Sequence, residues 1–366
     1  MHTTTPPASL RSAPQIAIVG AGMAGAACAR TLAASGAQVT LFDKSRGVGG
    51  RLSTRRTVWT DAQGAEQPVQ FDHGATHFSA HSLAFQTVVQ QGLAEGWIAR
   101  WAPRMGLQDA APDGLGSDRF VAVPGMPALC HALIGALEVH CGAPVTALHR
   151  VRGGWQIERD GGLWPQRFDH IVLALPPAQA APLLRPHATR WSEAAAQVPM
   201  QVCWTLMAVT DEPPGPAFDL LQPSHGPLDR IVRNDRKPGR TPIPGHAVWV
   251  AQASAAWSAS HVDAPAAAVS EALRDALRAV VNPGGSLRWC HSTVHRWLYA
   301  RPARTPLGTP GCWWDAAKGL GVCGDFLVGP QVEAAFLSGL DMAQAMRSAP
   351  ATRRTAAHGA ARFARL

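Results

Sequence analysis

Residues 15–43 read QIAIVGAGMAGAACARTLAASGAQVTLFD and contain the pattern that decides the fold. Residues 15–19 are a short apolar run rich in β-branched side chains, as expected for a buried parallel strand. A glycine-rich turn follows at once, and an alanine-rich helix pattern covers about residues 23–35. Residues 38–42 are a second strand candidate, which ends at Asp43. This order of strand, glycine turn, helix, strand and acid predicts a parallel βαβ unit.

The glycine turn has the spacing of a dinucleotide-binding loop. Gly20 permits the tight turn, Gly22 lets the backbone approach a pyrophosphate, and Gly25 lets the helix pack close to the strand. The N-terminus of the helix offers N–H groups and partial positive charge to phosphates. Asp43 lies 18 residues after Gly25 and can accept hydrogen bonds from ribose hydroxyls. We therefore predict a Rossmann-type nucleotide-binding unit.

The next segment distinguishes a nicotinamide cofactor from a flavin. Residues 44–56 read KSRGVGGRLSTRR, a compact glycine-rich loop from which Arg51 can reach pyrophosphate oxygens. A plain NAD dehydrogenase would continue here into another βα unit. A Gly-Gly-Arg loop in this position resembles the flavoprotein superfamily that includes amine oxidases and phytoene desaturases. The loop therefore favours FAD.

A second cofactor segment is predicted near the C-terminus. Residues 319–326 read GLGVCGDF, a strand that runs into a glycine turn, and a helix pattern extends from about Pro330 to residue 346. Asp325 can hydrogen-bond a ribityl hydroxyl, and the helix dipole would stabilise an anionic reduced flavin. Covalent attachment through Cys312 or Cys323 is the alternative, but neither lies in a recognisable attachment string. We predict non-covalent FAD.

The remaining segments predict a second domain. Strand-like runs dominate from about residue 200 to 252, a helix pattern covers 264–281, and residues 286–300 are extended. The fold class is α/β: a discontinuous Rossmann-type FAD-binding domain with an inserted α+β substrate domain on a mostly antiparallel sheet. The predicted boundaries are 14–80, 125–180 and 305–349 for the FAD-binding domain, 81–124 and 181–304 for the substrate domain, and 1–13 and 350–366 for mobile termini.

Composition limits the choice of partner. The chain has 366 residues, 46% of them hydrophobic, and a net charge of +8, much of it in basic clusters. No helix-turn-helix, zinc finger or aromatic RNP pattern accompanies these clusters, so phosphate-bearing small molecules fit better than nucleic acid. The basic segment 233–240 could hold the phosphates of a dinucleotide, and a solvated loop is equally compatible with it.

The cysteine content and the hydropathy pattern indicate the cellular compartment of the protein. The seven cysteines are odd in number and include no C-x-x-C pair, which is typical of a reducing compartment. The first fourteen residues lack the pattern of a secretory signal, and glycines and Arg30 interrupt the apolar stretch 16–37. We expect a cytoplasmic protein that does not bind a membrane.

An ordered set of strings resembles one family. The strings, which span about residues 15–346, are SRGVGGRLSTRR, FDHGATHFSA, PGMPAL, RNDRKPGR, WVAQASAAWSASH, HRWLYARP and CGDF…VEAAFLSG. In this order they are similar to bacterial renalase-like proteins, which resemble flavin amine oxidases in fold. The resemblance implies oxidation of misreduced dihydro-NAD(P), which carries its hydride at C2 or C6. The hydride passes to flavin N5, and O2 then reoxidises the flavin to give H2O2.

The resemblance also suggests site residues. Trp297 is the first candidate for a pocket wall, with ordinary core packing as the alternative. His295 and Tyr299 lie on the same face of an extended strand. His77 and Gln252 are further candidates, although His77 could equally be structural. No metal-ligand cluster is evident, and the four-residue spacing of histidines 73, 77 and 81 is not read as one. Besides the residues above, the expected cofactor contacts are Lys44, Gly50, Val145, Gly324, Val332 and Glu333.

Three positions depart from the family pattern and put the substrate in question. Thr76-His77 stands where the family usually has Gln-Tyr, Gln252 where bacterial members often have His, and Leu298 where they often have Arg. A flavin amine oxidase or desaturase acting on a small amine or lipophilic compound is therefore an alternative. Tyr299 is the single tyrosine of the chain, so a Tyr–Tyr pair around an amine is impossible. A non-catalytic flavin-binding protein is the second alternative.

Overall fold

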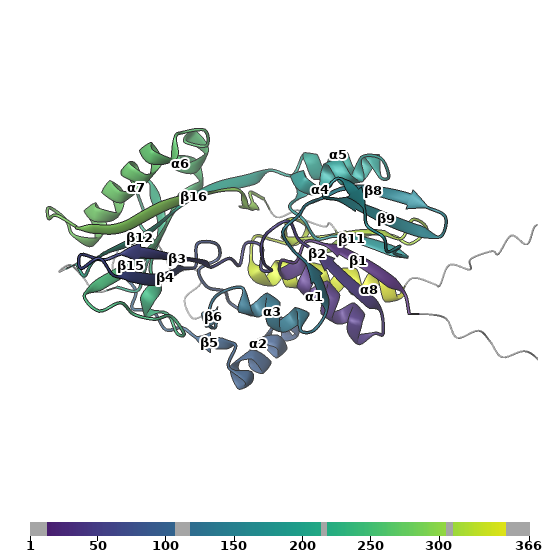
Figure 1. The fold of residues 1–366 in the computed structure, drawn as a ribbon, viewed down its shortest axis with the longest axis horizontal. Coiled ribbons are helices and arrows are strands. Elements are labelled where there is room, and N and C mark those ends of the chain that lie inside the picture. The colour runs from purple at the N-terminus through teal and green to yellow at the C-terminus, as the bar shows by residue number, and fades with distance from the viewer. Residues whose placement is uncertain (1–12, 107–117, 214–217, 305–309, 349–366) are drawn as a thin grey trace, which may run out of the picture.

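The computed structural model describes residues 13–106, 118–213, 218–304 and 310–348, which form two lobes side by side along the long axis (Figure 1). The predicted mobile termini lie outside these ranges, apart from residue 13. The helices are α1 (Met23–Ala34), α2 (Leu83–Glu95), α3 (Ala128–Ile134), α4 (Pro177–Leu184), α5 (Thr189–Ala196), α6 (Ala255–Ser260), α7 (Ala266–Val281) and α8 (Val332–Ser348), with short 3-10 helices η1 (Asn234–Arg236) and η2 (Asp325–Leu327). The strands are β1 (Gln15–Val19), β2 (Gln38–Phe42), β3 (Arg55–Thr60), β4 (Glu66–Phe71), β5 (Ile98–Arg100), β6 (Phe120–Ala122), β7 (Glu138–His140), β8 (Val145–Val151), β9 (Gly154–Arg159), β10 (Gly162–Leu163), β11 (His170–Leu173), β12 (Met200–Asp211), β13 (Leu220–Leu221), β14 (Leu228–Arg233), β15 (His246–Ala253), β16 (Trp289–Pro302), β17 (Cys312–Asp315) and β18 (Leu320–Cys323).

The first lobe is built on a six-stranded sheet. Its order is β17-β18-β11-β1-β2-β7, and all neighbours run parallel except β17, which is antiparallel to β18. The central strands are buried on both faces, which explains why they read as continuous apolar runs. β1, β11 and β18 come from three distant parts of the chain, so the predicted discontinuous Rossmann-type arrangement is confirmed.

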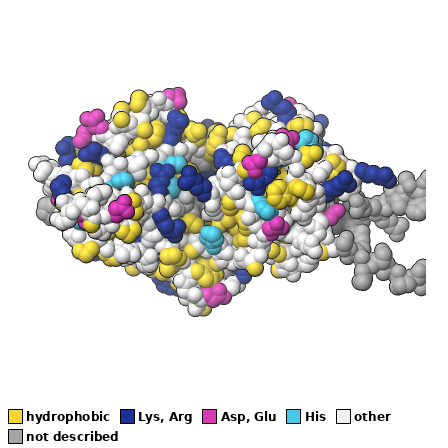
Figure 2. Space-filling view, in the orientation of Figure 1, with side chains coloured by type: hydrophobic (Ala, Val, Ile, Leu, Met, Phe, Trp, Pro, Cys, Tyr) yellow, Lys and Arg dark blue, Asp and Glu magenta, His cyan; other side chains and the backbone are white. Residues whose placement is uncertain are grey.

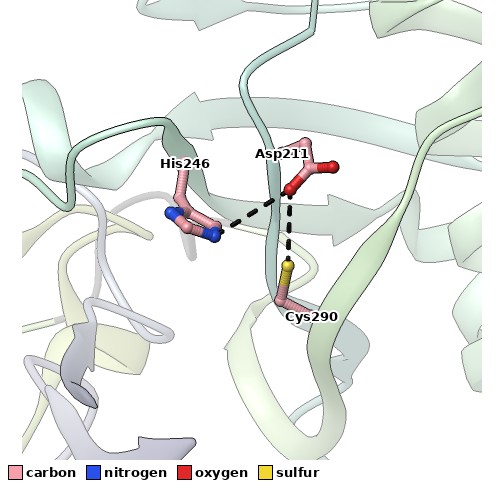
Figure 3. Close-up of side chains that lie close together, drawn as sticks. All are labelled: Asp211, His246 and Cys290. Carbon is pink, nitrogen blue, oxygen red and sulfur yellow. Dashed lines mark hydrogen bonds and ion pairs between the residues drawn. The ribbon is translucent and has the colours of Figure 1, made fainter. Parts of the chain in front are cut away.

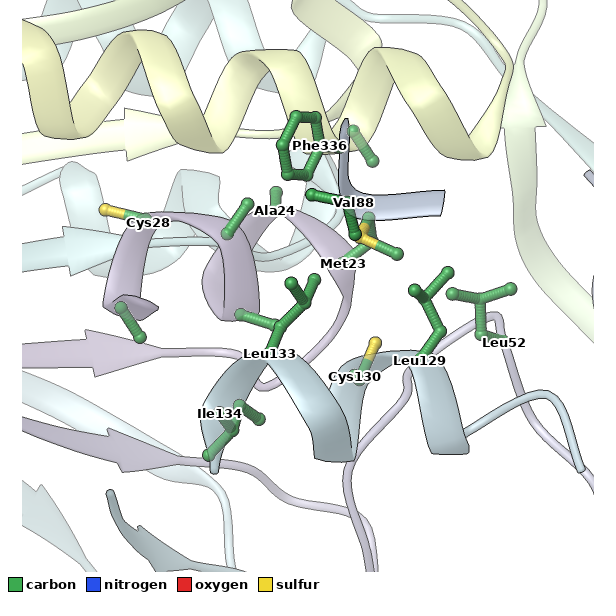
Figure 4. Packing of buried hydrophobic residues seen from close by; sticks show 14 of the residues in the cluster. Met23, Ala24, Cys28, Leu52, Val88, Leu129, Cys130, Leu133, Ile134 and Phe336 are labelled. Atoms are coloured by element: carbon green, nitrogen blue, oxygen red, sulfur yellow. The ribbon is translucent and has the colours of Figure 1, made fainter. Parts of the chain in front are cut away.

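Helices cover one face of this sheet. Met23, Ala24 and Cys28 on α1 pack between Phe336 on α8 and the apolar side chains of α3 (Figure 4). Val88 brings α2 into the same cluster. The opposite face is covered by the three-stranded sheet β8–β10 and by α4 and α5. The sheet is therefore shielded from water on both sides, as parallel sheets require.

The second lobe is built on a five-stranded sheet of order β13-β14-β15-β12-β16. Every neighbouring pair in it is antiparallel, which confirms the predicted antiparallel substrate sheet. One face packs against α7, whose Val269, Leu273, Leu277 and Val281 recur at helical spacing and are buried. The β3–β4 hairpin covers the other face through Trp59.

Two segments lie differently from the proposed domain boundaries, which otherwise stay a prediction. The β3–β4 hairpin falls within 14–80 but packs on the five-stranded sheet. Helix α2 falls within 81–124 but packs with α1 and α8. The sequence analysis also did not anticipate α5, β7 and β17. β7 and β17 have three and four residues, too few for a periodic pattern to identify them.

The basic segment 233–240 is neither a phosphate site nor a solvated loop, and both expectations are wrong. Lys237 and Arg240 are buried and bind Asp72, with Nζ–Oδ2 and Nη2–Oδ2 distances of 2.9 and 2.7 Å. Arg233 is also buried and pairs with Asp235 and Glu212. Buried charges need such partners, because an unpaired one is costly to desolvate. The segment therefore links the sheet of the second lobe to the loop that follows β4.

Candidate active site

A cavity of about 1320 Å³ lies where the two lobes meet. Its volume exceeds the roughly 300–1,000 Å³ that is usual for a pocket holding one small ligand. The first lobe contributes the turn after β1, the ends of β2 and β11, the 49–53 loop and the start of α8. The sheet of the second lobe contributes parts of β12, β14, β15 and β16. The cavity can therefore hold a long cofactor with room for a second molecule.

The turn after β1 has the geometry that close phosphate approach requires. Gly20 has φ +109°, and a Cβ there would lie 2.3 Å from the Ala174 carbonyl oxygen. A Cβ on Gly25 would lie 1.9 Å from the Gly20 carbonyl oxygen, so Gly25 serves helix packing and does not line the cavity. Helix α1 begins after Gly22, which has no capping side chain, and its first turn carries no acid. Its N–H groups at the cavity are thus available to an anion.

Asp43 closes the end of β2. Its Oδ2 accepts a hydrogen bond from the amide of Ala21 at 2.8 Å, and its Oδ1 accepts one from the amide of Ser45 at 2.8 Å. The carboxylate therefore joins the glycine turn to the loop after β2, at the position where a ribose diol was predicted. Lys44, next to it, is exposed and lines the cavity edge.

An ion pair connects the two predicted cofactor segments. Arg51 donates to both carboxylate oxygens of Asp325, with Nη1–Oδ2 and Nη2–Oδ1 distances of 2.8 and 2.6 Å. Arg51 also donates to the backbone oxygen of Ala300 on β16, at 3.2 Å. Bidentate pairs of this kind fix orientation as well as distance. Residues 274 positions apart in the chain therefore meet at the cavity wall.

The loop at Gly74 is fixed by side chains of the second lobe. The indole Nε1 of Trp297 donates to the carbonyl oxygen of His73 at 2.9 Å, and Gln252 Nε2 donates to that of Gly74 at 2.8 Å. A Cβ on Gly74 would lie 2.0 Å from the Arg51 carbonyl oxygen. The backbone at Gly74 therefore packs directly against the 49–53 loop. The contacts hold Trp297 and Gln252 in place at the cavity.

Trp297 belongs to an aromatic cluster. The rings of His73 and Trp297 are stacked with centroids 5.2 Å apart, and His295 meets Trp297 edge-on at 4.5 Å. Burial, reinforced by His295 and Arg55, lowers the pKa of His73 to about 4. Burial also lowers the pKa of His295. Both imidazoles are therefore neutral at pH 7, and the three rings form an uncharged aromatic wall.

His77 and the other positions at which the sequence differs from the renalase-like pattern line the cavity. The ring of His77 lies 5.4 Å from that of Trp101, and Nδ1 is 3.1 Å from Thr76 Oγ1. Burial, together with Arg230 and other cations, lowers the pKa of His77 well below its usual value. Thr76, Gln252 and Leu298 line the same cavity. The positions that differ from the renalase-like pattern are thus grouped where a substrate would bind.

The other predicted cofactor residues also reach the cavity. Gly50, Val145, Gly324 and Val332 line it. Glu333 lines it too, but its carboxylate accepts hydrogen bonds from the amides of His81 and Ser82 at the start of α2. Sequence reasoning missed lining residues that carry no motif, because strand and helix ends bring them in from distant positions. These include Leu175, Gln179, Gln201, Asp229, Arg230 and Arg301.

The cysteines considered for covalent attachment lie elsewhere. Cys312 and Cys323 are register partners across β17 and β18 and do not line the cavity. Cys203 does line it, but burial raises the pKa of its thiol to about 11, so it stays protonated at neutral pH. This placement agrees with non-covalent cofactor binding.

Comparison with known families identifies the group to which the protein belongs. Residues 107–347, more than half of the chain, match the model of the flavin containing amine oxidoreductases. The chain belongs to this family. Residues 18–91 match an NAD(P)-binding Rossmann-like domain. The two matches together identify a flavin-dependent oxidoreductase whose cofactor is FAD.

Individual relatives agree at the level of the fold. A proposed protoporphyrinogen oxidase from Exiguobacterium sp. 255-15 superposes with a TM-score of 0.68 at 13% identity, covering 92% of this chain and 99% of that one. Cyclohexylamine oxidase from Brevibacterium oxydans IH-35A gives 0.64 at 14% identity, covering 91% and 98%. Putrescine oxidase bound to putrescine gives 0.62 at 14% identity, covering 92% and 99%.

One curated relative matches over a shorter stretch. Carotenoid phi-ring synthase of Streptomyces griseus is 35% identical over 123 residues, which are 32% of this chain. The match spans 21% of that relative's length.

The residues at the cavity fit an FAD molecule. The uncapped α1 N-terminus would offer donors to the pyrophosphate, and glycines would allow the backbone to come close to it. Asp43 lies at the end of β2, where the adenosine ribose would bind, and Asp325 lies at the opposite cofactor segment, where the ribityl chain would bind. Both acids line one continuous cavity, as a single extended cofactor requires.

Stability should decrease in mild acid because of His73. Its pKa is about 4 in the folded protein and about 6.5 when unfolded, so between these values only the unfolded chain binds the proton. We predict that His73 accounts for about 2 kcal/mol of the loss in unfolding free energy between pH 7 and 5. Urea unfolding of wild type and His73→Gln at both pH values measures this term. The exposed His131→Gln variant is the control, and equal pH dependence of all three proteins would refute the prediction.

Proposed function

We propose that this protein is an FAD-dependent oxidase of misreduced dihydro-NAD(P), the isomers that carry hydride at C2 or C6. The substrate is a small-molecule dinucleotide, and the second substrate is O2, which is reduced to H2O2. Neither nucleic acid nor a membrane surface is a partner in this proposal, and the enzyme acts in the cytoplasm. None of the helices in the described part of the chain is long and apolar enough to cross a membrane.

The proposal rests on the excess of positive charge on the side of the cavity that the five-stranded sheet forms. Arg230 and Arg301 line the cavity from the five-stranded sheet, and Asp229, 4.0 Å from Arg301, is the acid that lines it from there among the described residues. Arg301 donates through Nε to Gln201 Oε1 at 2.6 Å. Basic side chains also gather on the sheet lobe beside its junction with the first lobe (Figure 2). An excess of guanidinium groups favours a substrate that carries phosphates over a cationic amine.

The aromatic wall suits a flat nicotinamide ring. Trp297 is held by its hydrogen bond to His73 and by stacking on the imidazole, so its position is set before a substrate enters. Such preorganisation matters because hydride transfer depends on the distance and alignment of two rings. Bound FAD supplies the hydride acceptor.

The protonation states also support a hydride donor that needs no base. A dihydronicotinamide expels hydride with the help of its own nitrogen lone pair, and no proton has to be removed. His73, His77 and His295 have lowered pKa values because they are buried, and are neutral at pH 7. They can shape the cavity and donate or accept hydrogen bonds without adding charge. We assign Trp297 and His295 to the wall, and Gln252 and His77 to substrate contacts.

An amine substrate is the second candidate. Structures of similar fold include a putrescine oxidase with bound putrescine and a cyclohexylamine oxidase. Trp297 could replace one tyrosine of an aromatic pair, but the ring stacked on it is the imidazole of His73. A protein that binds flavin without turnover is the third candidate, and it predicts a reduced flavin that does not react with O2.

Anaerobic mixing separates these candidates. We predict that 2- or 6-dihydro-NAD bleaches the flavin absorbance in one rapid phase, and that admission of O2 restores the colour with formation of H2O2. A panel of primary and secondary amines should leave the spectrum unchanged. Bleaching by amines and not by dinucleotides would overturn the proposal, and failure of O2 to restore the colour would favour the non-catalytic candidate.

The arginines should contribute to binding and not to chemistry. We predict that Arg230→Gln raises KM for a dihydro dinucleotide by about tenfold, with kcat changed much less, because phosphate contacts are the same in the ground and transition states. The phosphate-free dihydronicotinamide riboside should show no such increase. Steady-state oxygen consumption measures both, with exposed Arg152→Gln as the control. An equal effect on both substrates would contradict phosphate recognition by Arg230.

A further inference from the structure

A cluster of three potential metal ligands lies at the end of the five-stranded sheet and outside the cavity. Asp211 ends β12, His246 begins β15, and Cys290 is near the start of β16 (Figure 3). Their ligand atoms all lie within 4.8 Å of one another. The sequence analysis predicted no metal-ligand cluster, because these residues are 35 and 44 positions apart and follow no motif.

Two of the three pairs of ligand atoms have nearly the separation that a zinc ion needs. Asp211 Oδ1 lies 3.9 Å from His246 Nε2 and 3.8 Å from Cys290 Sγ. Zinc bonds of about 2.0–2.3 Å in a tetrahedral arrangement place neighbouring ligand atoms roughly 3.5 Å apart. The two Asp211 separations need shifts of a few tenths of an ångström, and His246 Nε2 and Cys290 Sγ, which lie within 4.8 Å, need to approach by at most about 1.3 Å.

The backbone and a neighbouring carbonyl orient two of the ligands. His246 Nδ1 lies 2.8 Å from the carbonyl oxygen of Pro244, which can only accept, so Nδ1 carries the proton and Nε2 presents its lone pair. A carbonyl partner on the far ring nitrogen is typical of metal-binding histidines. β12 and β16 pair Val209 with His291 and Thr210 with Trp289, so Cys290 is the extra residue of a β-bulge. A bulge of this kind re-aims a side chain.

Arg288 fixes the position of Asp211, the third ligand, and the site is open to solvent. Arg288 donates to both oxygens of Asp211 at 2.7 Å, which fixes the carboxylate and leaves Oδ1 a second acceptor direction. The side chain of Asp211 is 41% exposed, so an ion and a water ligand can enter. Carboxylate, imidazole and thiolate together suit Zn²⁺ better than Mg²⁺ or Ca²⁺, which prefer oxygen ligands.

We propose that Asp211, His246 and Cys290 bind one Zn²⁺ ion, with water as the fourth ligand, and that the ion clamps the ends of three strands. Cys203, which lines the cavity from the same β12, is eight residues away, roughly 25 Å along an extended strand. The ion therefore acts on the stability of the sheet and not on the flavin reaction.

Metal titration of the full flavin-containing protein tests this proposal. After dialysis against a chelator, we expect one equivalent of Zn²⁺ to bind in equilibrium dialysis and to raise the melting temperature, because the ion binds the folded state. Co²⁺ should bind at the same site and give the near-ultraviolet charge-transfer band of a thiolate ligand. This spectrum needs no variant, so it does not depend on how a variant folds.

Variants assign the ligands. Cys290→Ser and His246→Gln should each weaken Zn²⁺ binding by at least about tenfold and remove the rise in melting temperature, while the flavin spectrum stays the same. Cys141→Ser alters another half-buried thiol and should bind as wild type does. Absence of a stoichiometric Zn²⁺ ion on the wild type, a Co²⁺ spectrum without a thiolate band, or unchanged affinity in both ligand variants would each overturn the proposal.

Discussion

The parallel pairing of β1 with β11 and of β11 with β18 is the constraint on which the rest of the structure depends. The register aligns Ala17 with Ile171, and Ile171 with Leu320, so three segments more than 140 residues apart end at one edge of a sheet. Ligands of open parallel sheets bind at the carboxyl ends of the strands. The glycine turn after β1 and the Gly324-Asp325 turn after β18 meet there, and Arg51 joins them through Asp325.

Some charged side chains form buried ion pairs that stabilise the fold, and others line the cavity. Asp72 accepts from both Lys237 and Arg240, which hold the pKa of its carboxyl low despite burial. Burial, reinforced by the charge of Arg240, lowers the pKa of Lys237 to about 8, although Asp72 opposes the shift. This network ties the loop after β4 to the second lobe, so the wall formed by His73 and Trp297 rests on it. Arg230 on β14 and Arg301 on β16, in contrast, line the cavity.

Local signals explain how much of this could be predicted from the sequence. The βαβ unit, the helix α7 and the long strand β16 each contain a complete pattern within one segment, and the corresponding elements are present. Predicted site residues on glycine turns and strand ends, such as Gly20, Asp43 and Asp325, line the cavity, and their binding roles stay a prediction. Contacts that depend on packing were not found. Asp72 and Lys237 are 165 residues apart, and a run of basic residues looks the same in sequence whether it is buried or solvated. The Asp211, His246 and Cys290 cluster likewise depends on a bulge that no sequence pattern marks.

A crystal structure of the protein with its flavin is the most direct test of the central claim, that one FAD spans the edge shared by β1, β11 and β18. The account predicts the adenosine ribose at Asp43, the pyrophosphate at the N-terminus of α1, and the isoalloxazine between the Gly324 turn and the wall that contains Trp297. Electron density for a flavin outside this cavity, or for one that contacts the glycine turn but not the Gly324 segment, would contradict it.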